Sequence, residues 1–151
     1  MIISEVIGTP ELQARFNQLS TDMHNGVARA IFALTIELQR MVKQDKLSGQ
    51  VLNTRTSNLR NSIAENVTDN GSIIEGTVGT NVSAIPYARI HEFGGEIKAK
   101  RAKFLRFKIG NRWISKKSVT IPERSYLRSA LKDLEPKIRE VITDHLKEFR
   151  V

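Results

Sequence analysis

The chain has 151 residues, of which 40% are hydrophobic and 26% are charged, and it carries a formal net charge of +8 with no cysteine. This composition excludes a disordered tail and predicts one globular domain over residues 1–151. Without cysteine there can be no disulfide, thiolate nucleophile or thiolate metal ligand. The longest mostly apolar stretch, residues 27–36, is too short to span a membrane, so we expect no membrane partner.

The N-terminal third is predicted to be helical. Residues 9–11, Thr-Pro-Glu, are typical of a helix start because they supply a hydroxyl cap, a proline and then an acid. Apolar residues at helical spacing predict a first helix and then a longer one over 23–42, with Gly26 close to the junction. A polar loop over 46–55 is expected to follow and to offer a contact surface.

The next segment changes from helical to alternating periodicity. Residues 53–63 are predicted to form a loop that leads into one helical turn, followed by strands over 64–68 and 72–80. The Asp-Asn-Gly sequence at 69–71 indicates a hairpin turn between these strands. The residues expected to anchor the helical turn in the core are Leu59 and Ile63. Two glycines are expected to weaken the second strand or to mark a bulge, namely Gly76 and Gly79.

A short helix is predicted over residues 87–93, because Pro86 suits its first turn and Gly94 suits a C-terminal cap. The residues expected to line its core side are Tyr87, Ile90 and Phe93. His91 and Glu92 are expected to lie towards the surface. Two further strands are predicted over residues 96–119, the first of them beginning near residue 96, directly after this helix.

The pair His91-Glu92 begins like the zinc-protease pattern H-E-x-x-H, but the position of the second histidine is Gly95. The three histidines of the chain are His24, His91 and His145, and no two have metal-ligand spacing. Adjacent residues on a helix point about 100° apart, so this pair is also poorly aimed for acid–base chemistry. We therefore expect no enzyme activity, no metal and no cofactor.

Residues 98–117 hold nine basic residues without an acid, and strands on either side of Gly110-Asn111 predict a hairpin with a type II′ turn. In this pairing Lys108 faces Trp113, which would allow a cation–π contact. The residues expected to point into the core are Leu105, Phe107 and Ile109. Such a patch indicates an acidic partner, either protein or nucleic acid. The candidate partner-binding residues are Lys98, Lys100, Arg101, Lys103, Arg106, Lys108, Arg112, Trp113, Lys116 and Lys117.

The C-terminal segment is predicted to be a helix, because apolar residues from 127 to 149 keep helical spacing. Pro136 interrupts this stripe. Proline removes a backbone hydrogen bond and crowds the preceding turn, so we expect a kink or a break near residues 133–135.

Three motifs resemble those of a known family. They are T-S-N-L-R-N-S-I at 56–63, V-G-T at 78–80 followed by Y-A-R-I-H-E-F-G-G at 87–95, and I-P-E-R-S-Y-L-R-S-A-L at 121–131. The ordered set is similar to the neck and tail-completion proteins of long-tailed phages and prophages, also called tail-component or virion-morphogenesis proteins. The fold-signature residues are Leu59, Ile63, Gly79, Tyr87, Glu92, Phe93, Gly94, Pro122, Arg124, Tyr126 and Leu127. Departures from the family pattern are Ser57, Ser125, Tyr126 and Ser129.

The resemblance implies an α+β fold, with long N-terminal helices and a C-terminal helix packed on a mainly antiparallel β-sheet. It also implies a structural protein without catalysis, which completes the tail or joins it to the DNA-filled head at the neck. The implied partners are other neck and tail proteins (tail terminator, head-closure or connector proteins) and further copies in a homo-oligomeric ring. The protein would be assembled in the host cytoplasm and lie in the virion, close to packaged DNA. The alternative is a nucleic-acid-binding module that uses the hairpin at 98–117.

Overall fold

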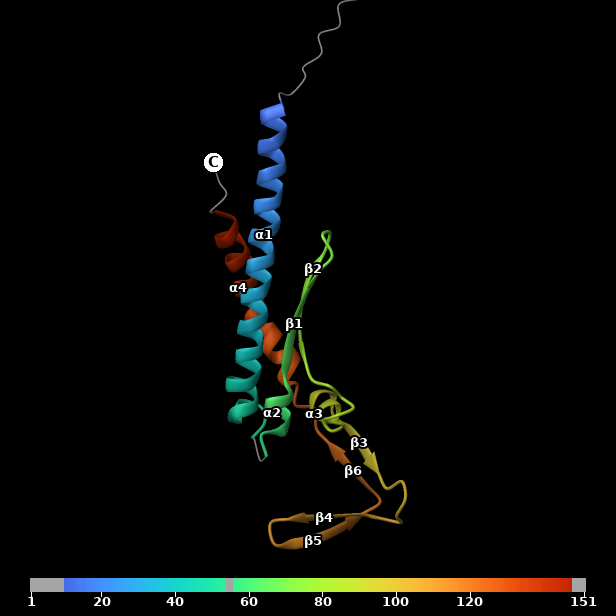
Figure 1. Ribbon diagram of the computed structural model, residues 1–151. Coiled ribbons are helices and arrows are strands. Elements are labelled where there is room, and N and C mark those ends of the chain that lie inside the picture. The colour runs from blue at the N-terminus through green and yellow to red at the C-terminus, as the bar shows by residue number, and fades with distance from the viewer. Residues whose placement is uncertain (1–9, 54–55, 148–151) are drawn as a thin grey trace, which may run out of the picture.

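The computed structural model describes residues 10–53 and 56–147, and one long helix is its largest element (Figure 1). Helix α1 (Pro10–Arg40) has 31 residues, which corresponds to a length of about 46 Å at 1.5 Å per residue. It continues into a wider, π-helical segment, η1 (Met41–Gln50), which ends where Gly49 adopts a φ of 120°. The polar sequence around Gly49 therefore ends the helix as expected.

The predicted junction near Gly26 is wrong, because α1 runs through this residue without a break. The apolar residues on both sides of Gly26 follow one continuous helical stripe, so the same face remains available for packing. A glycine inside a helix costs about 1 kcal/mol, which the packing of a long helix offsets. The predicted cap, Thr9, lies outside the described residues.

Helix α4 (Tyr126–Lys147) lies beside α1 and runs in the opposite direction (Figure 1). Ala30 and Leu34 of α1 and Leu134 of α4 are buried. The predicted break near Pro136 is absent, because α4 remains helical through this residue. Pro136 and the residue four positions before it are both exposed, so water can bond to the carbonyl group that the proline leaves free.

The first hairpin packs against α1 and consists of β1 (Ala64–Asp69) and β2 (Ile74–Gly79) (Figure 1). The predicted turn is confirmed: the Asp69 side chain accepts a hydrogen bond of 2.8 Å from the Gly71 amide. Pairing is regular from Ala64–Gly79 to Asp69–Ile74, so the predicted bulge is absent. At the tip, His24 Nε2 lies 2.7 Å from Asp69 Oδ2 and joins the hairpin to α1.

Gly76 lies where β2 approaches α1 so closely that a side chain would not fit. A Cβ atom at this position would overlap the hydroxyl of Thr35 and lie 3.2 Å from Ile31 Cγ2. Thr35 cannot turn away freely, since it is buried and its hydroxyl donates a hydrogen bond of 2.7 Å to the Ile31 carbonyl. The glycine thus fits a helix–strand contact.

We expect Gly76→Ala to lower the free energy of unfolding by about 1–3 kcal/mol, because the added methyl group overpacks the contact with α1. Urea denaturation measures this change. Gly79→Ala is the matched control in the same strand, since no atom lies within 4 Å of a Cβ added there. Equal unfolding midpoints for the two variants would show that β2 does not press on α1.

The remaining elements are short. Helix α2 (Asn58–Ser62) precedes β1, and α3 (Ala88–Phe93) leads into β3 (Gly95–Lys98). Strand β3 pairs with β6 (Ser118–Ile121), and β4 (Leu105–Ile109) pairs with β5 (Arg112–Lys116). Where the sequence predicted two strands over 96–119, the structure therefore has four.

The fold class is α+β, as predicted, but the strands form three separate two-stranded antiparallel ribbons in place of one sheet. The core lies where the end of α1, η1, β2 and the start of α4 meet. Its buried residues are Val42, Leu47, Leu52, Ile63, Tyr126 and Ala130. Over the described ranges 10–53 and 56–147, no helix has the length and apolarity that crossing a bilayer requires.

Candidate functional site

Glu92 in α3 is buried, with only 3% of its surface exposed. Its carboxylate accepts a hydrogen bond of 2.9 Å from the Leu127 amide and one of 3.1 Å from the Arg128 amide. These amides lie in the first turn of α4, where N–H groups have no partner within the helix. The positive end of the helix dipole also favours a carboxylate there. Glu92 therefore caps α4 from a different part of the chain.

Arg128 binds the same carboxylate with its side chain. Its Nε donates to Glu92 Oε1 at 3.1 Å, and its Nη2 donates to the Glu92 carbonyl at 3.0 Å and to Glu123 Oε1 at 2.8 Å. Its guanidinium carbon lies 4.8 Å from the centre of the Phe93 ring. Arg128 was missed among the predicted signature residues. The available signal was its charge, because a cation in the first turn of a helix is unfavourable without a nearby acid.

Backbone contacts complete this α3–α4 junction, which we define as residues 88–94 and 121–128. The Arg124 amide donates to the His91 carbonyl at 2.9 Å. The Tyr126 hydroxyl donates to the Ala88 carbonyl at 3.4 Å. The second and third sequence motifs thus fold into one unit.

The predicted orientation of α3 is wrong. Of the three residues expected on its core side, Ile90 is half-buried, but Tyr87 and Phe93 are 40% and 57% exposed. Ala88 and Glu92 are the buried residues of the helix. The reason is that capping α4 requires a carboxylate on the inner face, and hydrophobic periodicity does not reveal such a requirement.

Two titratable groups of the junction are shifted towards their neutral forms. Burial, and then the positive charge of Arg124, lower the pKa of His91. Burial, and then the negative charge of Glu92, raise the pKa of Tyr126 to about 12. The His91 Nδ1 atom is buried and has no hydrogen-bond partner among the described residues. Neutral forms suit an environment with few polar partners.

We expect the wild-type protein to lose stability, relative to Tyr126→Phe, as the pH rises from about 10 to about 12. The folded state holds the phenol proton up to a pKa of about 12, whereas the unfolded state releases it near 10, so the stabilisation is complete below pH 10. At pH 11.5 the loss relative to Tyr126→Phe should be roughly 2 kcal/mol. Urea denaturation of both proteins at pH 8 and pH 11.5 measures it. A constant difference between the proteins would contradict the raised pKa.

The first motif, residues 56–63, contacts both the second motif and the core. Ile63 is 2% exposed, and Leu59 packs against the same core cluster. The Ser62 hydroxyl lies 2.6 Å from that of Thr80, which belongs to the V-G-T motif. Ser57, where the family pattern has glycine, has a φ of 59° and is the only non-glycine residue with a positive φ in the described ranges. The backbone thus keeps the conformation that glycine adopts most readily.

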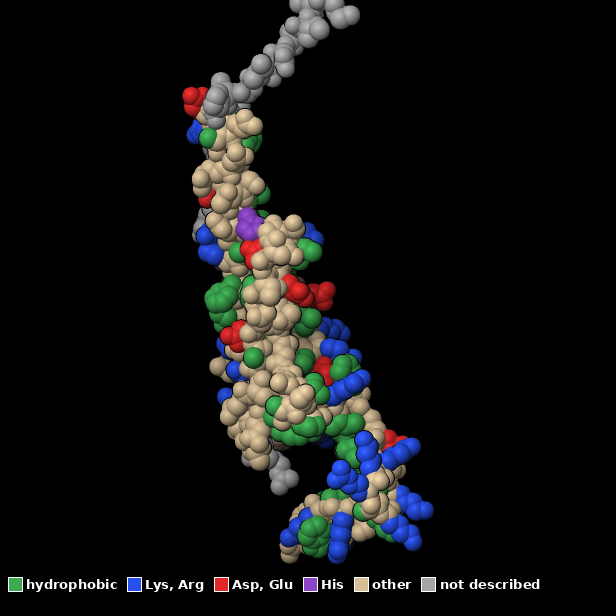
Figure 2. Space-filling view, turned by 45° about the vertical axis from the view of Figure 1, so that its right-hand side comes forward, with side chains coloured by type: hydrophobic (Ala, Val, Ile, Leu, Met, Phe, Trp, Pro, Cys, Tyr) green, Lys and Arg blue, Asp and Glu red, His purple; other side chains and the backbone are tan. Residues whose placement is uncertain are grey.

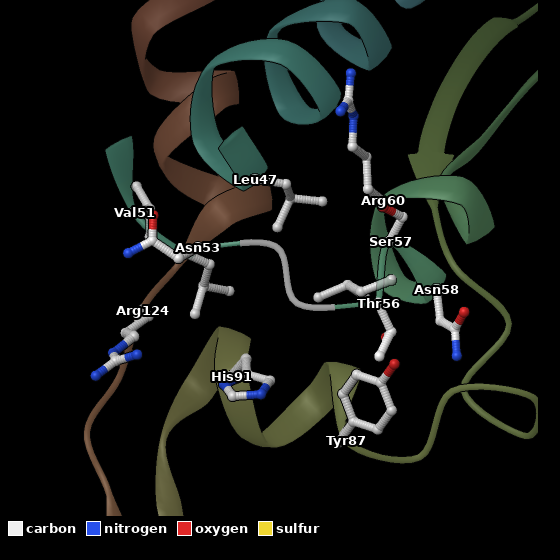
Figure 3. Close-up of a pocket in the computed structure, with 12 residues that line it drawn as sticks. Leu47, Val51, Asn53, Thr56, Ser57, Asn58, Arg60, Tyr87, His91 and Arg124 are labelled. Atoms are coloured by element: carbon white, nitrogen blue, oxygen red, sulfur yellow. The ribbon is translucent and has the colours of Figure 1, made fainter. Parts of the chain in front are cut away.

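A pocket of about 900 Å³ lies between η1, α2 and α3 (Figure 3). His91 projects into it from α3 and Tyr87 from the position just before α3, and Leu47 points towards them from η1. Arg60 and Arg124 lie at its edge. The rings of Tyr87 and His91 meet edge to face at 5.9 Å. All three motifs contribute lining residues, so the pocket follows from the fold signature.

The loop predicted as a contact surface over 46–55 is partly core. Lys46 and Leu47 are buried, as is Leu52. The Lys46 ammonium lies 2.5 Å from Asp133 Oδ2 of α4, so this cation has an internal partner. The Lys46 side chain is 7% exposed, whereas that of Asp133 is 53% exposed. Residues 54–55 lie outside the described part of the chain.

The predicted partner-binding residues gather at one end of the molecule (Figure 2). Strands β4 and β5 form a hairpin that stands apart from the helices, and β3 and β6 connect it to the α3–α4 junction (Figure 1). We call residues 105–116 the arm. Its two-residue turn, Gly110-Asn111, has a φ of 59° at Gly110 and no positive φ at Asn111, which agrees with the predicted type II′ turn.

The two faces of the arm differ. Arg106 and Lys108 share one face with Trp113, and the Arg106 guanidinium lies 5.5 Å from the centre of the Trp113 ring. Lys108 does lie opposite Trp113 as predicted, but the cation–π contact that forms is that of the diagonal neighbour, Arg106. Trp113 is 65% exposed.

The other face of the arm carries the apolar residues Leu105, Phe107, Ile109 and Ile114, with Arg112 opposite Ile109 and Lys116 opposite Leu105 at its two ends. We call it the apolar face. The pairing of Phe107 with Ile114 is confirmed. The prediction that Ile109 points into the core is wrong, since it is 60% exposed. The alternation of apolar and polar residues showed that these side chains share a face. It did not show whether another element packs on that face.

The three histidines occupy separate places, in α1, α3 and α4. His145 Nδ1 lies 2.9 Å from the Val141 carbonyl within its own helix. In the part of the chain that the structure describes, no three His, Asp or Glu residues are grouped so that they could hold a metal ion.

Residues 32–147 match the phage virion morphogenesis family. No curated protein and no solved structure gives a significant match. The matched range contains all three motifs, the α3–α4 junction and the arm, and the family is one of structural and assembly proteins. Because the match covers most of the sequence, the chain belongs to the phage virion morphogenesis family.

Proposed function

We propose that this protein is a non-enzymatic assembly protein, which completes the phage tail or joins it to the head at the neck. The observation that carries this proposal is the arm, whose apolar face has Ile109 60% exposed. An isolated two-stranded hairpin is at best marginally stable in water. Docking of this face on a partner would remove its apolar surface from water, which favours a protein contact.

The partners that fit this role are tail terminator, head-closure or connector proteins, together with further copies of the chain. We propose a homo-oligomeric ring, because contacts between unlike surfaces of identical subunits close into rings when the rotation permits. The arm and the helical body differ in shape and charge, so a contact between them would be of this unlike kind. The proposed location is the neck or the tail end of the virion, after assembly in the host cytoplasm.

The test is complementation of a phage that lacks the gene, with electron microscopy of the lysate. A protein in which a short Gly-Ser linker replaces residues 105–116 should leave filled heads and separate tails. Its thermal transition should be kept, because the core cluster contains no residue of the arm. Normal infectious particles with the armless protein would remove this proposal.

A matched pair separates the two faces of the arm. Ile109→Ser removes an apolar side chain, and Lys108→Ser removes a neighbouring side chain on the opposite face. Both residues are exposed, so neither change should unfold the protein. We expect Ile109→Ser to reduce the yield of joined particles and Lys108→Ser to leave it unchanged. The reverse order would contradict docking through the apolar face.

A further inference from the structure

The arm and the segment before it form the most strongly charged surface of the molecule. Nine lysines and arginines lie between Lys98 and Lys117, and no acid lies between Glu96 and Glu123. Glu96 is already engaged: hydrogen bonds from Ser118 and then from Lys98 lower its pKa, and Lys98 Nζ lies 3.1 Å from its carboxylate. None of the other eight cations forms an ion pair with a described acid.

The shape of the arm suits the groove of a nucleic acid or a backbone that carries regularly repeated charges. Five residues in each strand give a ribbon about 17 Å long, and neither β4 nor β5 pairs with a third strand. A two-stranded β-ribbon of this kind fits the major groove of B-form DNA, which is about 12 Å wide. On the face that carries Trp113, Arg106 and Lys108 supply cations, Ser115 supplies a hydroxyl donor, and Trp113 supplies a flat ring.

The distribution of charge favours nucleic acid over an acidic protein. Protein interfaces gain specificity from complementary patterns of both signs, which fix one register between the partners. This surface carries one sign on both strands and in the loop before them, so it fixes no register. A polyanion with evenly repeated phosphates can neutralise such a set in many positions.

We propose that the arm binds the phosphate backbone of double-stranded DNA without sequence preference, through Arg106, Lys108, Arg112 and Lys116, with Trp113 beside them. The exposed Lys100, Arg101 and Lys103 add to the positive field at the base of the arm. This activity is independent of the proposed assembly role. Arg106 and Lys108 lie on the face that carries Trp113, whereas Arg112 and Lys116 lie at the two ends of the other face, on either side of Phe107 and Ile114.

The test is fluorescence anisotropy of a labelled 20-base-pair duplex with the full-length protein, titrated at 50 to 200 mM NaCl. With four to six phosphate contacts, the affinity should fall roughly 10²- to 10³-fold over this range. Two duplexes of unrelated sequence should bind equally. Absence of binding at 50 mM NaCl would overturn the proposal.

Any protein with a net charge of +8 attracts DNA, so a matched control is needed. The arm variant carries Arg106→Gln, Lys108→Gln and Arg112→Gln, and the control carries Arg15→Gln, Lys132→Gln and Arg139→Gln at exposed sites in α1 and α4. Both variants lose three charges. The arm variant should bind the duplex at least about tenfold more weakly, and its slope of log K against log salt concentration should be smaller by about three. The affinity of the control should fall less than about threefold.

Equal losses in the two variants would overturn the proposal, because they would show attraction to the whole protein. Binding of the arm to polyglutamate but not to DNA would also overturn it, in favour of an acidic protein partner. Thermal melting of both variants checks the fold, and a transition like that of the wild type is expected because the exchanged side chains are exposed. Failure of DNA binding would leave the assembly proposal standing, since that is read from particles.

Discussion

Glu92→Ala is expected to lower the free energy of unfolding by about 2–4 kcal/mol, which urea denaturation at pH 7 measures. The change leaves the amides of Leu127 and Arg128 without their acceptor and removes the carboxylate from the N-terminus of α4. It also takes away the buried partner of the Arg128 side chain. Three interactions of one buried group are lost together.

The control is Glu123→Gln, which removes the other carboxylate that Arg128 binds. Both Glu123 and Arg128 are more than half exposed, so this change should cost no more than about 1 kcal/mol. Glu92→Gln should fall between the two, because one carboxylate oxygen is replaced by an NH2 group, which donates and cannot accept a hydrogen bond. Similar costs for Glu92→Ala and Glu123→Gln would show that Glu92 acts only as a surface charge.

Gly94→Ala is expected to lower the free energy of unfolding by about 3 kcal/mol or more. Gly94 has a φ of 67° and a ψ of −175°, a combination that is open essentially to glycine alone. An added Cβ would also lie 2.7 Å from the Glu123 nitrogen and 3.1 Å from the Ile121 carbonyl oxygen. The substitution therefore adds backbone strain and drives α3 away from the chain that leads into α4.

Gly71→Ala separates these two costs. Gly71 also has a positive φ, of 84°, but no atom lies within 4 Å of a Cβ added there. This variant should lose only the conformational part, about 1–2 kcal/mol. Denaturation of both variants under the same conditions gives the difference. If Gly71→Ala lowered the free energy of unfolding as much as Gly94→Ala, the close approach of Gly94 to Glu123 would not contribute to the cost.

Much of the local structure could be predicted from the sequence. Asp69-Asn70-Gly71 indicated the first hairpin, and Gly110-Asn111 indicated the turn of the arm, because these turns need residues that adopt unusual backbone angles. Helical spacing located α4 and the later part of α1. The nine cations of 98–117 also identified the charged surface, since charge is a property of composition.

The errors concern which face of an element meets what. In α3 the apolar stripe suggested that Phe93 lies inside and Glu92 outside, and the structure has the opposite arrangement. In the arm, alternation grouped Ile109 with Phe107 correctly but gave no sign that the hairpin stands apart from the helices. Gly76 suggested a bulge, whereas it allows the contact of β2 with Thr35.

The sequence by itself determined the α+β class, the two hairpin turns, the charged segment and the three motifs that indicate the family, because each depends on residues close together in the chain. Only the tertiary structure decided that Glu92 caps α4, 35 residues away, and that Arg128 joins the same group. A buried carboxylate is stable only when donors surround it, and those donors come from another helix. The separation of the arm from the body was likewise decided by contacts between distant elements, which no local pattern records.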